Sequence, residues 1–298
     1  MSLAAPAQRL TIIGVGLIGG SLARALRREH PGIEVVGCGR HLPNLERARE
    51  LGVIDRYETD PGRAVEGSDL VVVAVPVGAI GPIFAAIAGH LAAGAVVTDV
   101  GSTKGNIVDA ARRNLGGRLA DFVPGHPIAG TERSGVGASF AELFQGCRVI
   151  LTPLAETRRT ALERVRALWT LAGARVSEMD VRHHDEVLAA TSHLPHLLAY
   201  TLVDTLARMD DSEEIFDYAA GGFRDFTRIA SSDPALWRDI SIANRDAMLD
   251  TVQRFTDNLA AVTEALQRND GDALMKVFAR AKEVRDRFAA RGKTQSPE

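Results

Sequence analysis

The chain has 298 residues, of which 46% are hydrophobic and 24% charged, enough to build two domains with a core each. A formal net charge of −3 gives no electrostatic reason to expect nucleic acid or a membrane surface as a partner, and no apolar run approaches the ~20 residues of a membrane span. The two cysteines, Cys38 and Cys147, stand far apart and suit a reducing compartment, so we expect a cytoplasmic protein.

The chain begins with MSLAAPAQ, which lacks the basic and apolar regions of a secretion signal, and we expect a short disordered leader. The β-branched run RLTIIG then predicts a buried strand, and GVGLIGGSLARALRREH follows it with G-x-G-x-x-G spacing and helical periodicity. In such a turn the glycines permit a tight bend, a close approach of pyrophosphate and close helix–strand packing, while the helix N-terminus attracts phosphate. We therefore predict a dinucleotide site that includes Gly14, Gly16, Leu17, Ile18 and Gly19.

Further strands are predicted at EVVGC, DLVVVAVP, AVVTDV, DFVPG and RVILTP, with helical stretches between most of them. This alternation predicts an α/β Rossmann-like domain over residues 8–180, with a doubly wound, mostly parallel sheet. Ligands of such sheets bind beyond the carboxyl ends of the strands. We therefore expect the glycine turn, Val75–Pro76, Gly101–Lys104 and His126–Gly130 to meet at one mouth.

The end of the second strand, VVGCGRHLPN, bears on the choice of cofactor. NAD-selective sites place an acidic residue there to bind the ribose hydroxyls, and Gly39 occupies the expected position. Glycine removes the charge that would repel a 2′-phosphate, and Arg40 can donate a charge-assisted pair of hydrogen bonds to it. We predict NAD(P) as cofactor with a preference for NADP; in the alternative, Arg40 stacks on adenine and either cofactor is accepted.

The stretch DFVPGHPIAGTERSG places His126 between Gly125 and Pro127, just after a predicted strand. Backbone this rigid is more typical of a ligand site than of a core, and the mouth of the sheet is where a nicotinamide would lie. The alternative is a turn whose histidine faces water.

Beyond about Met179 the pattern becomes helical, and we predict an all-α domain over residues 181–292. Residues 181–209 are expected to form one long helix that Pro195 bends. A second helix should start near Pro234 and run amphipathically for about thirty residues, about 45 Å, with a third at 272–288. Because one small domain cannot cover so long an apolar face, we predict a homodimer.

The segment AAGGFRDFTRIASSDPALWRD is expected to be a loop that either clamps a ligand or merely connects two helices. Four histidines lie just before it in the sequence, at 183, 184, 193 and 196. His193 and His196 could join Asp185 in a metal site, but no H-E-x-x-H pattern is present and Pro195 separates them, so we predict no metal. We interpret His183 and His184 as packed histidines with satisfied nitrogens. His196, exposed by the proline bend, is the stronger ligand candidate.

Five segments together resemble the prephenate dehydrogenase family in order and spacing, over about residues 9–288: GVGLIGGSLA, DVGSTK, GHPIAGTERSG, SHLPH and GGFRDFTRIASSDPALWRDI. The resemblance implies oxidation and decarboxylation of prephenate or arogenate, with hydride transfer to NAD(P)⁺, in tyrosine biosynthesis. It implies that His126 is the base and that Ser102 orients it. It further implies that Arg228 clamps a substrate carboxylate and that His196 and the Gly221–Gly222 backbone meet the side-chain end of the substrate. Glu132 is expected to pair with a cation when substrate is absent. Thr131, His193, Asp225 and Trp237 match further family positions.

Two alternatives stay open at this point. A β-hydroxyacid or imine reductase would share the two-domain architecture but would use a catalytic lysine or hydroxyl on a helix of the second domain. A cofactor-sensing protein would keep the fold without catalysis, although the presence of His126, Ser102 and Arg228 argues against it.

Overall fold

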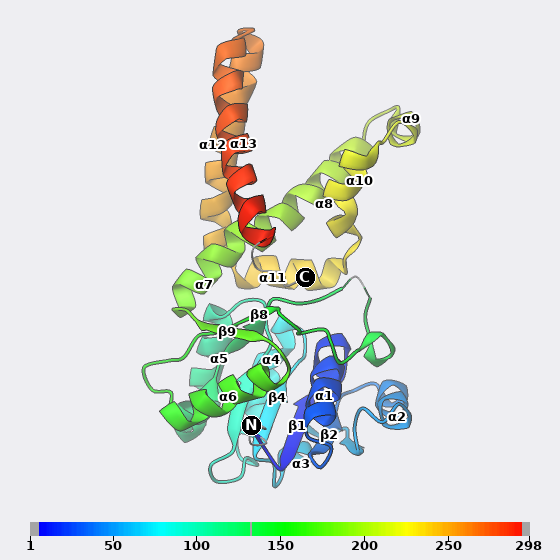
Figure 1. Cartoon of the computed structure of the whole chain (residues 1–298), viewed down its shortest axis with the longest axis vertical. Coiled ribbons are helices and arrows are strands. Elements are labelled where there is room, and N and C mark those ends of the chain that lie inside the picture. The colour runs from blue at the N-terminus through cyan, green and yellow to red at the C-terminus, as the bar shows by residue number, and fades with distance from the viewer. Residues whose placement is uncertain (1–5, 132, 294–298) are drawn as a thin grey trace. The chain divides into compact units, whose positions relative to one another are not determined.

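The computed structural model describes residues 6–131 and 133–293 (Figure 1). The chain divides into two compact units, residues 1–248 and residues 249–298. The first unit contains every described strand, and the second contains most of helix α12 (Arg245–Gln267) and helix α13 (Gly271–Lys293). Within the part of the chain that is described, no helix is both long enough and apolar enough to cross a bilayer.

A six-stranded sheet lies at the centre of the first unit, and every neighbouring pair of strands is parallel. Its order is β3-β2-β1-β4-β5-β6, which is the common dinucleotide-binding order and confirms the predicted doubly wound fold. The strands are β1 (Arg9–Ile13), β2 (Glu34–Cys38), β3 (Arg56–Glu58), β4 (Leu70–Val73), β5 (Val96–Asp99) and β6 (Phe122–Val123). The helices of this part are α1 (Leu17–Glu29), α2 (Leu42–Glu50), α3 (Pro61–Val65), α4 (Val77–Ile87), α5 (Gly105–Asn114) and α6 (Arg159–Leu171), with short 3-10 turns η1 (Gly116–Asp121) and η2 (Val136–Ala138).

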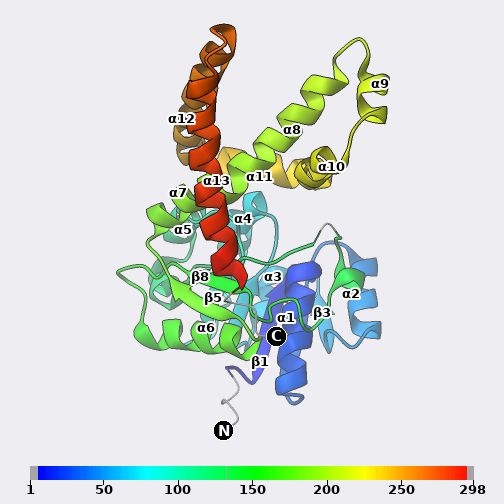
Figure 2. The same ribbon diagram turned by 45° about the horizontal axis from the view of Figure 1, so that its top comes forward.

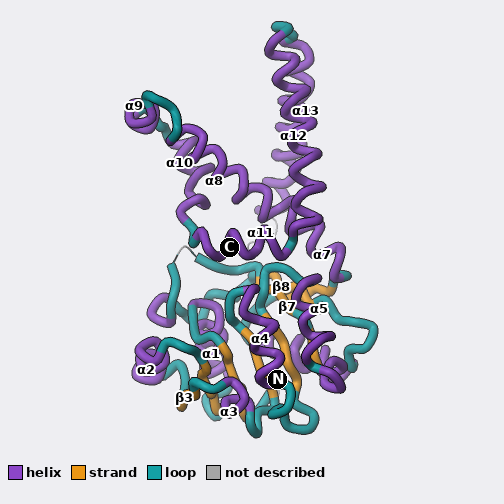
Figure 3. The backbone as a smooth tube through the Cα atoms, turned by 180° about the vertical axis from the view of Figure 1, so that it is seen from behind, coloured by secondary structure: helices purple, strands orange, loops and turns teal. Residues whose placement is uncertain are grey.

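Helices cover both faces of this sheet, which explains why β4 is apolar at every position. Leu70 and Val72 belong to a core that also contains buried side chains of α1 and α6. Val71 and Val73 belong to a second core with buried side chains of α4 and α5. Figure 1 shows the face with α1 and α6, and Figure 3 shows the opposite face with α4 in front.

The predicted strand RVILTP does not continue the main sheet, and the residues that follow the predicted strand DFVPG form a further strand that was not predicted. Residues 125–127 (β7, Gly125–Pro127) and 148–151 (β8, Arg148–Leu151) pair antiparallel with each other, and β9 (Arg175–Glu178) adds to β8 in parallel. Pro124, between β6 and β7, has no N–H to give to a ladder, so the sixth strand ends at Val123. The chain then turns into this three-stranded sheet, and His126 lies on its first strand.

The helical part of the first unit differs from the predicted pair of long helices. Residues 181–207 form α7 (Val181–Leu188), a π-helical turn η3 (Ala189–His193) and α8 (Leu194–Ala207). Pro195 lies in the first turn of α8 and has no N–H for the preceding turn, so the helix is wound differently just before it. Beyond α8 lies a short helix α9 (Ser212–Asp217).

The prediction of a loop at residues 219–239 is wrong, because most of this segment is helical. It forms α10 (Gly221–Thr227), a 3-10 turn η4 (Arg228–Ser231) and the start of α11 (Pro234–Ala243). The predicted single helix from Pro234 is also interrupted, at Asn244, where φ is −109° and ψ is 31°. The side-chain amide of Asn244 donates to the carbonyl of Asp185 at 2.8 Å, and that contact accompanies the break.

The second unit is a pair of helices that run side by side, as Figures 1 and 2 both show. Helix α13 includes the predicted third helix at 272–288, which is confirmed. Large apolar side chains on both helices are more than half exposed: Leu249, Leu259, Leu266, Met275, Phe278, Val284 and Phe288. Their number indicates a surface that another apolar surface would cover.

Candidate functional site

The glycine turn after β1 has the geometry that a pyrophosphate site requires. Gly14 has φ +101°, and a Cβ there would lie 2.2 Å from the carbonyl oxygen of Ala74. A Cβ on Gly19 would lie 2.3 Å from the carbonyl oxygen of Gly14, so this glycine lets α1 pack against the strand. At Gly16 nothing lies within 4 Å of the same position, so the space above the turn is open.

The first turn of α1 is free to bind an anion. Gly16 caps the helix without a side-chain hydrogen bond, and no acidic residue stands in the first turn. Backbone N–H groups at such an end attract phosphate, so Leu17 and Ile18 would contribute through their backbone while their side chains pack in or against the core. The open cradle and the uncapped helix end fit the pyrophosphate of a nicotinamide dinucleotide.

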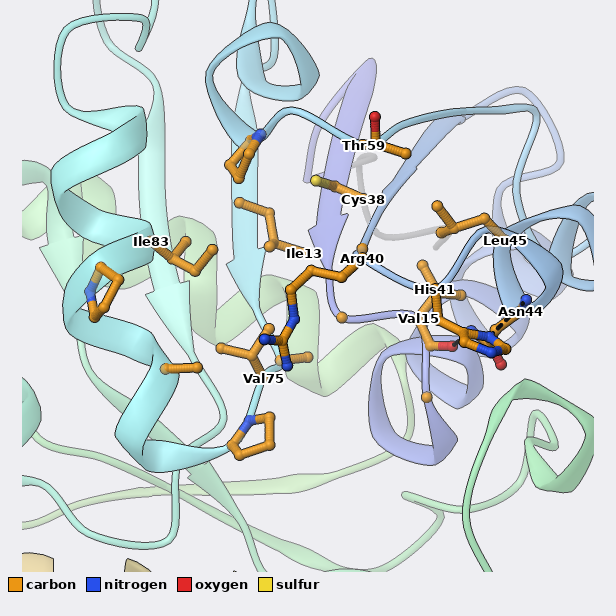
Figure 4. Close-up of a pocket in the computed structure, with 18 of the residues that line it drawn as sticks. Ile13, Val15, Cys38, Arg40, His41, Asn44, Leu45, Thr59, Val75 and Ile83 are labelled. Atoms are coloured by element: carbon orange, nitrogen blue, oxygen red, sulfur yellow. Dashed lines mark hydrogen bonds between the residues drawn. The ribbon is translucent and has the colours of Figure 1, made fainter.

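A cavity of about 980 Å³ extends from this turn across the ends of β2 and β4. The predicted residues Gly14, Gly16, Gly39, Arg40, Val75 and Pro76 line it. In Figure 4 the side chain of Arg40 reaches from the end of β2 across the pocket toward Val75. His41 and Asn44, which were not predicted as site residues, also line it. The side chain of Asn44 donates to the carbonyl of Val15 at 2.7 Å and so ties α2 to the glycine turn.

His126 is not a solvent-facing turn residue. It lies on β7 with 8% of its surface exposed, and its Nδ1 is 2.9 Å from Nε2 of His184 on α7. Burial is the main reason that the pKa of His126 lies well below its usual value, and the neighbouring basic groups His184, Lys104 and His193 lower it further. The imidazole is therefore neutral at neutral pH and able to accept a proton.

Ser102 is half-buried and follows β5 at the carboxyl edge of the six-stranded sheet. Among the described residues, no hydrogen bond joins it to His126, whose Nδ1 is occupied by His184. The orienting role of Ser102 therefore stays a prediction.

A buried ion pair, which was not predicted from the sequence, supports the backbone before His126. The Lys104 ammonium pairs with Asp99 and donates to the carbonyl of Gly125 at 2.6 Å, and both charged side chains are completely buried. Asp99 in turn accepts the backbone N–H groups of Gly101 at 2.7 Å and Gly125 at 3.2 Å. Burial lowers the pKa of Lys104, although the Asp99 carboxylate opposes the shift. The signal in the sequence was DVGSTK, where an acidic residue ends a strand and a lysine opens the next helix.

His184 and Asp185 form the second overlooked cluster. His184 is buried with both nitrogens bonded, as predicted, but its partners are His126 and Asp185. The carboxylate of Asp185 also accepts the N–H groups of Lys104 and Gly105 at the start of α5. His183, by contrast, is exposed, so its predicted packing is wrong.

The remaining histidines lie with Trp237 in the helical part. The ring of His196 stacks on Trp237 with centroids 3.5 Å apart and 18° between planes, and its Nδ1 is 2.8 Å from the carbonyl of Ser192. His193 is buried, with Nδ1 3.1 Å from the amide nitrogen of Asn244, and burial lowers its pKa to about 4. Within the described ranges, no group of three or more His, Cys, Asp and Glu is placed to hold a metal ion.

The other predicted substrate residues lie on or beside these elements. Arg228 opens η4 close enough to His196 for its charge to lower the pKa of that histidine, after burial as the main cause. Gly221 and Gly222 begin α10, and Asp225 is exposed on it. Thr131 is exposed, and its hydroxyl accepts the N–H of Arg133. Glu132 lies outside the described residues.

Comparison with known proteins gives matches over nearly the whole chain. Residues 22–178 match the family model described as "Prephenate dehydrogenase, nucleotide-binding domain", and residues 180–280 match "Prephenate dehydrogenase, dimerization domain". The chain is 39% identical to a cyclohexadienyl dehydrogenase of Zymomonas mobilis, covering 93% of this chain and 95% of that protein. It is 36% identical to a prephenate dehydrogenase of Bacillus subtilis, covering 97% and 78%. A solved prephenate dehydrogenase of Aquifex aeolicus, in complex with hydroxyphenyl propionate and NAD⁺, superposes with a TM-score of 0.89 at 37% identity, covering 94% and 98%.

Proposed function

Because the chain belongs to the prephenate dehydrogenase family, we propose that it catalyses the oxidative decarboxylation of prephenate, arogenate or both in tyrosine biosynthesis. A nicotinamide dinucleotide, when bound, supplies the hydride acceptor. The observation that best supports the proposal is the buried, neutral imidazole of His126 at the carboxyl edge of the sheet. The family match does not favour a β-hydroxyacid reductase or a non-catalytic sensor.

The reaction requires one base, and the substrate ring loses a hydride and CO₂. The proton of the ring hydroxyl moves to His126 as the hydrogen on the same carbon leaves as hydride. Loss of the ring carboxylate as CO₂ leaves its electron pair to complete the aromatic ring, and the phenolic oxygen regains a proton. A histidine with a low pKa is unprotonated at neutral pH and so ready for this step.

We assign substrate binding to the residues around the His196–Trp237 stack. Arg228 can hold a substrate carboxylate with two parallel hydrogen bonds, and its charge acts close to His196. His196 and the N–H groups of Gly221 and Gly222 at the start of α10 are assigned to the side-chain end of the substrate. Thr131, Glu132, Asp225 and Trp237 are proposed to complete the site.

The direct test is to follow absorbance of the reduced nicotinamide with prephenate and with arogenate, each against NAD⁺ and NADP⁺. General-base assistance is typically worth about 10²–10⁴-fold, so His126→Asn should lower kcat by about that factor and leave cofactor affinity unchanged. Turnover of neither substrate would refute the function. Near-normal turnover of His126→Asn would refute the role of this residue.

We propose NADP⁺ as the preferred cofactor, with use at least equal to that of NAD⁺. Gly39 brings no negative charge to the end of β2, and Arg40 extends into the cofactor cavity. A Cβ at Gly39 would meet only Leu45, at 3.6 Å, so an aspartate can be accommodated there. Gly39→Asp with Arg40→Ile should therefore shift preference toward NAD⁺, measured as the ratio of kcat/KM values. A wild-type preference for NAD⁺ of more than about tenfold, or 1.4 kcal/mol, would contradict the argument.

We propose that residues 8–180 form the cofactor domain and residues 181–292 the substrate and dimerisation domain. The exposed apolar side chains of α12 and α13 support a homodimer, because a second copy can cover them. Sedimentation at micromolar concentration should give about twice the chain mass, and a stable active monomer would refute the dimer. Both cysteines are unpaired, which supports a cytoplasmic location.

A further inference from the structure

A row of three hydrogen-bonded side chains lies behind the proposed base. Nδ1 of His126 is 2.9 Å from Nε2 of His184, and Nδ1 of His184 is 2.8 Å from Oδ1 of Asp185. The three residues are buried, with exposed fractions of 8%, 0% and 8%. We propose that Asp185 and His184 are positioning residues that keep the proton of His126 on Nδ1 and leave Nε2 as the basic nitrogen. This inference rests on the proposed function of His126.

Because the carboxylate of Asp185 is ionised, it determines which nitrogen of each histidine in the row carries the proton. It accepts the backbone N–H groups of Lys104 and Gly105 at 2.8 Å each, where the N-terminus of α5 adds positive potential. Burial alone would raise its pKa, but the hydrogen bonds from His184, Gly105 and Lys104 outweigh burial and lower it. An ionised carboxylate can only accept hydrogen bonds. The nitrogen of His184 that faces it must therefore carry a proton.

His184 passes this constraint on to His126. Burial lowers the pKa of His184 against the opposing hydrogen bond with Asp185, so the ring is neutral and carries one proton. With that proton on Nδ1, its Nε2 is a hydrogen-bond acceptor. The facing Nδ1 of His126 must then be the donor, and the two rings meet edge to face, with centroids 5.1 Å apart. The second nitrogen of His126 is left with its lone pair.

The opposite arrangement is excluded by the same contacts. If His126 carried its proton on Nε2, two lone pairs would face each other across 2.9 Å, or His184 would turn a bare nitrogen toward a carboxylate. The other charged and titratable groups around His126 are Lys104, which is paired with Asp99, and His193. Neither forms a hydrogen bond with the His126 ring within the described residues, so the row alone decides the tautomer.

The row also stabilises the positively charged form of His126 that arises in the reaction. When Nε2 of His126 takes the hydroxyl proton, the proton on Nδ1 stays in place and its hydrogen bond to His184 becomes charge-assisted. The ionised carboxylate of Asp185 stabilises the positive charge through the intervening ring. The arrangement is similar to the way an aspartate orients the histidine of a serine-protease triad, with one imidazole interposed.

The tautomers can be read directly by nitrogen-15 NMR of the full-length protein labelled at histidine, without substrate. At pH 7.5 the signals of His126, assigned from their loss in His126→Asn, should show a protonated Nδ1 and a bare Nε2. His184, assigned in the same way from His184→Gln, should also be protonated on Nδ1. A proton on Nε2 of either ring would overturn the proposal.

Three variants separate positioning from a general structural role. His184→Leu removes the acceptor, so the His126 signals should become those of mixed tautomers. Since general-base assistance is worth about 10²–10⁴-fold, kcat should fall about tenfold or more while substrate KM changes less than about threefold. His184→Gln can donate to Asp185 and accept from His126, and should restore most of kcat. His183→Leu, the neighbouring exposed histidine, is the matched control and should match wild type.

The outcomes distinguish this inference from the function on which it rests. Absence of turnover in the wild type, with the NMR tautomers as stated, would refute the function and leave the row in place. An active wild type with equal kcat losses in His184→Leu and His184→Gln, or with unchanged tautomers in His184→Leu, would overturn the positioning role.

Discussion

Because the space above Gly16 is open, a substitution there should weaken cofactor binding with little effect on the stability of the fold. A methyl group on Gly16 meets no atom within 4 Å, and its φ of −101° is accessible to alanine. Gly16→Ala should therefore change the free energy of unfolding by less than about 1 kcal/mol. The methyl group would occupy the space that a pyrophosphate needs, so the Kd for the cofactor should rise at least about tenfold, or 1.4 kcal/mol.

Gly19→Ala should show the opposite pattern. Its methyl group would lie 2.3 Å from the carbonyl oxygen of Gly14 and 2.7 Å from Cγ2 of Ile12, and a backbone oxygen cannot move aside easily. Overpacking typically costs about 1–3 kcal/mol, from which the preference of a helix for alanine over glycine recovers about 0.5–1 kcal/mol. We expect a net loss of about 1–2 kcal/mol in the free energy of unfolding.

The assay combines urea unfolding, followed by circular dichroism, with fluorescence titration of reduced cofactor. Gly32→Ala is a matched control, because a methyl group there also meets nothing within 4 Å but lies outside the cavity. It should match wild type in both measurements. Wild-type cofactor affinity in Gly16→Ala, or a loss of stability equal to that of Gly19→Ala, would refute the assignment of the glycines.

Two further predictions concern buried charge. Lys104→Met and Asp99→Asn each leave one buried partner uncompensated, so each should lower the free energy of unfolding by about 3–5 kcal/mol in urea titrations. The double variant should cost clearly less than the sum, and strict additivity would show that the pair is not coupled. Acid should also destabilise the protein: burial lowers the pKa of His193 to about 4 and that of His126 well below 6.5. As the pH falls below 6.5, these histidines become protonated in the unfolded chain but stay neutral in the folded chain. The free energy of unfolding should therefore drop between pH 6.5 and 4. Equal urea midpoints at pH 7 and pH 5 would contradict this.

Local sequence patterns were sufficient for the elements whose structure depends on near neighbours. The β-branched run of β1, the glycine turn and the periodicity of α1 lie within residues 9–29, and they predicted the cofactor-binding end of the sheet. The alternation of strands and helices predicted the doubly wound fold, because each parallel strand requires a crossover helix before the next. The glycine and proline that flank His126 predicted a functional role for this histidine, which stays a prediction.

Tertiary structure decided the rest, because it depends on contacts between residues far apart in the chain. His184 reaches His126 across 58 positions, and Asp185 reaches the N–H of Lys104 across 81. The sequence led us to expect that His184 is packed, but a periodic pattern reports only which face of a helix is buried and does not name the partners of a side chain. The break at Asn244 has the same origin, since the amide that bonds Asp185 lies 59 positions beyond it. Which imidazole nitrogen is basic is therefore set by the packing of α7 against β7 and α5, and no local stretch of the sequence carries that information.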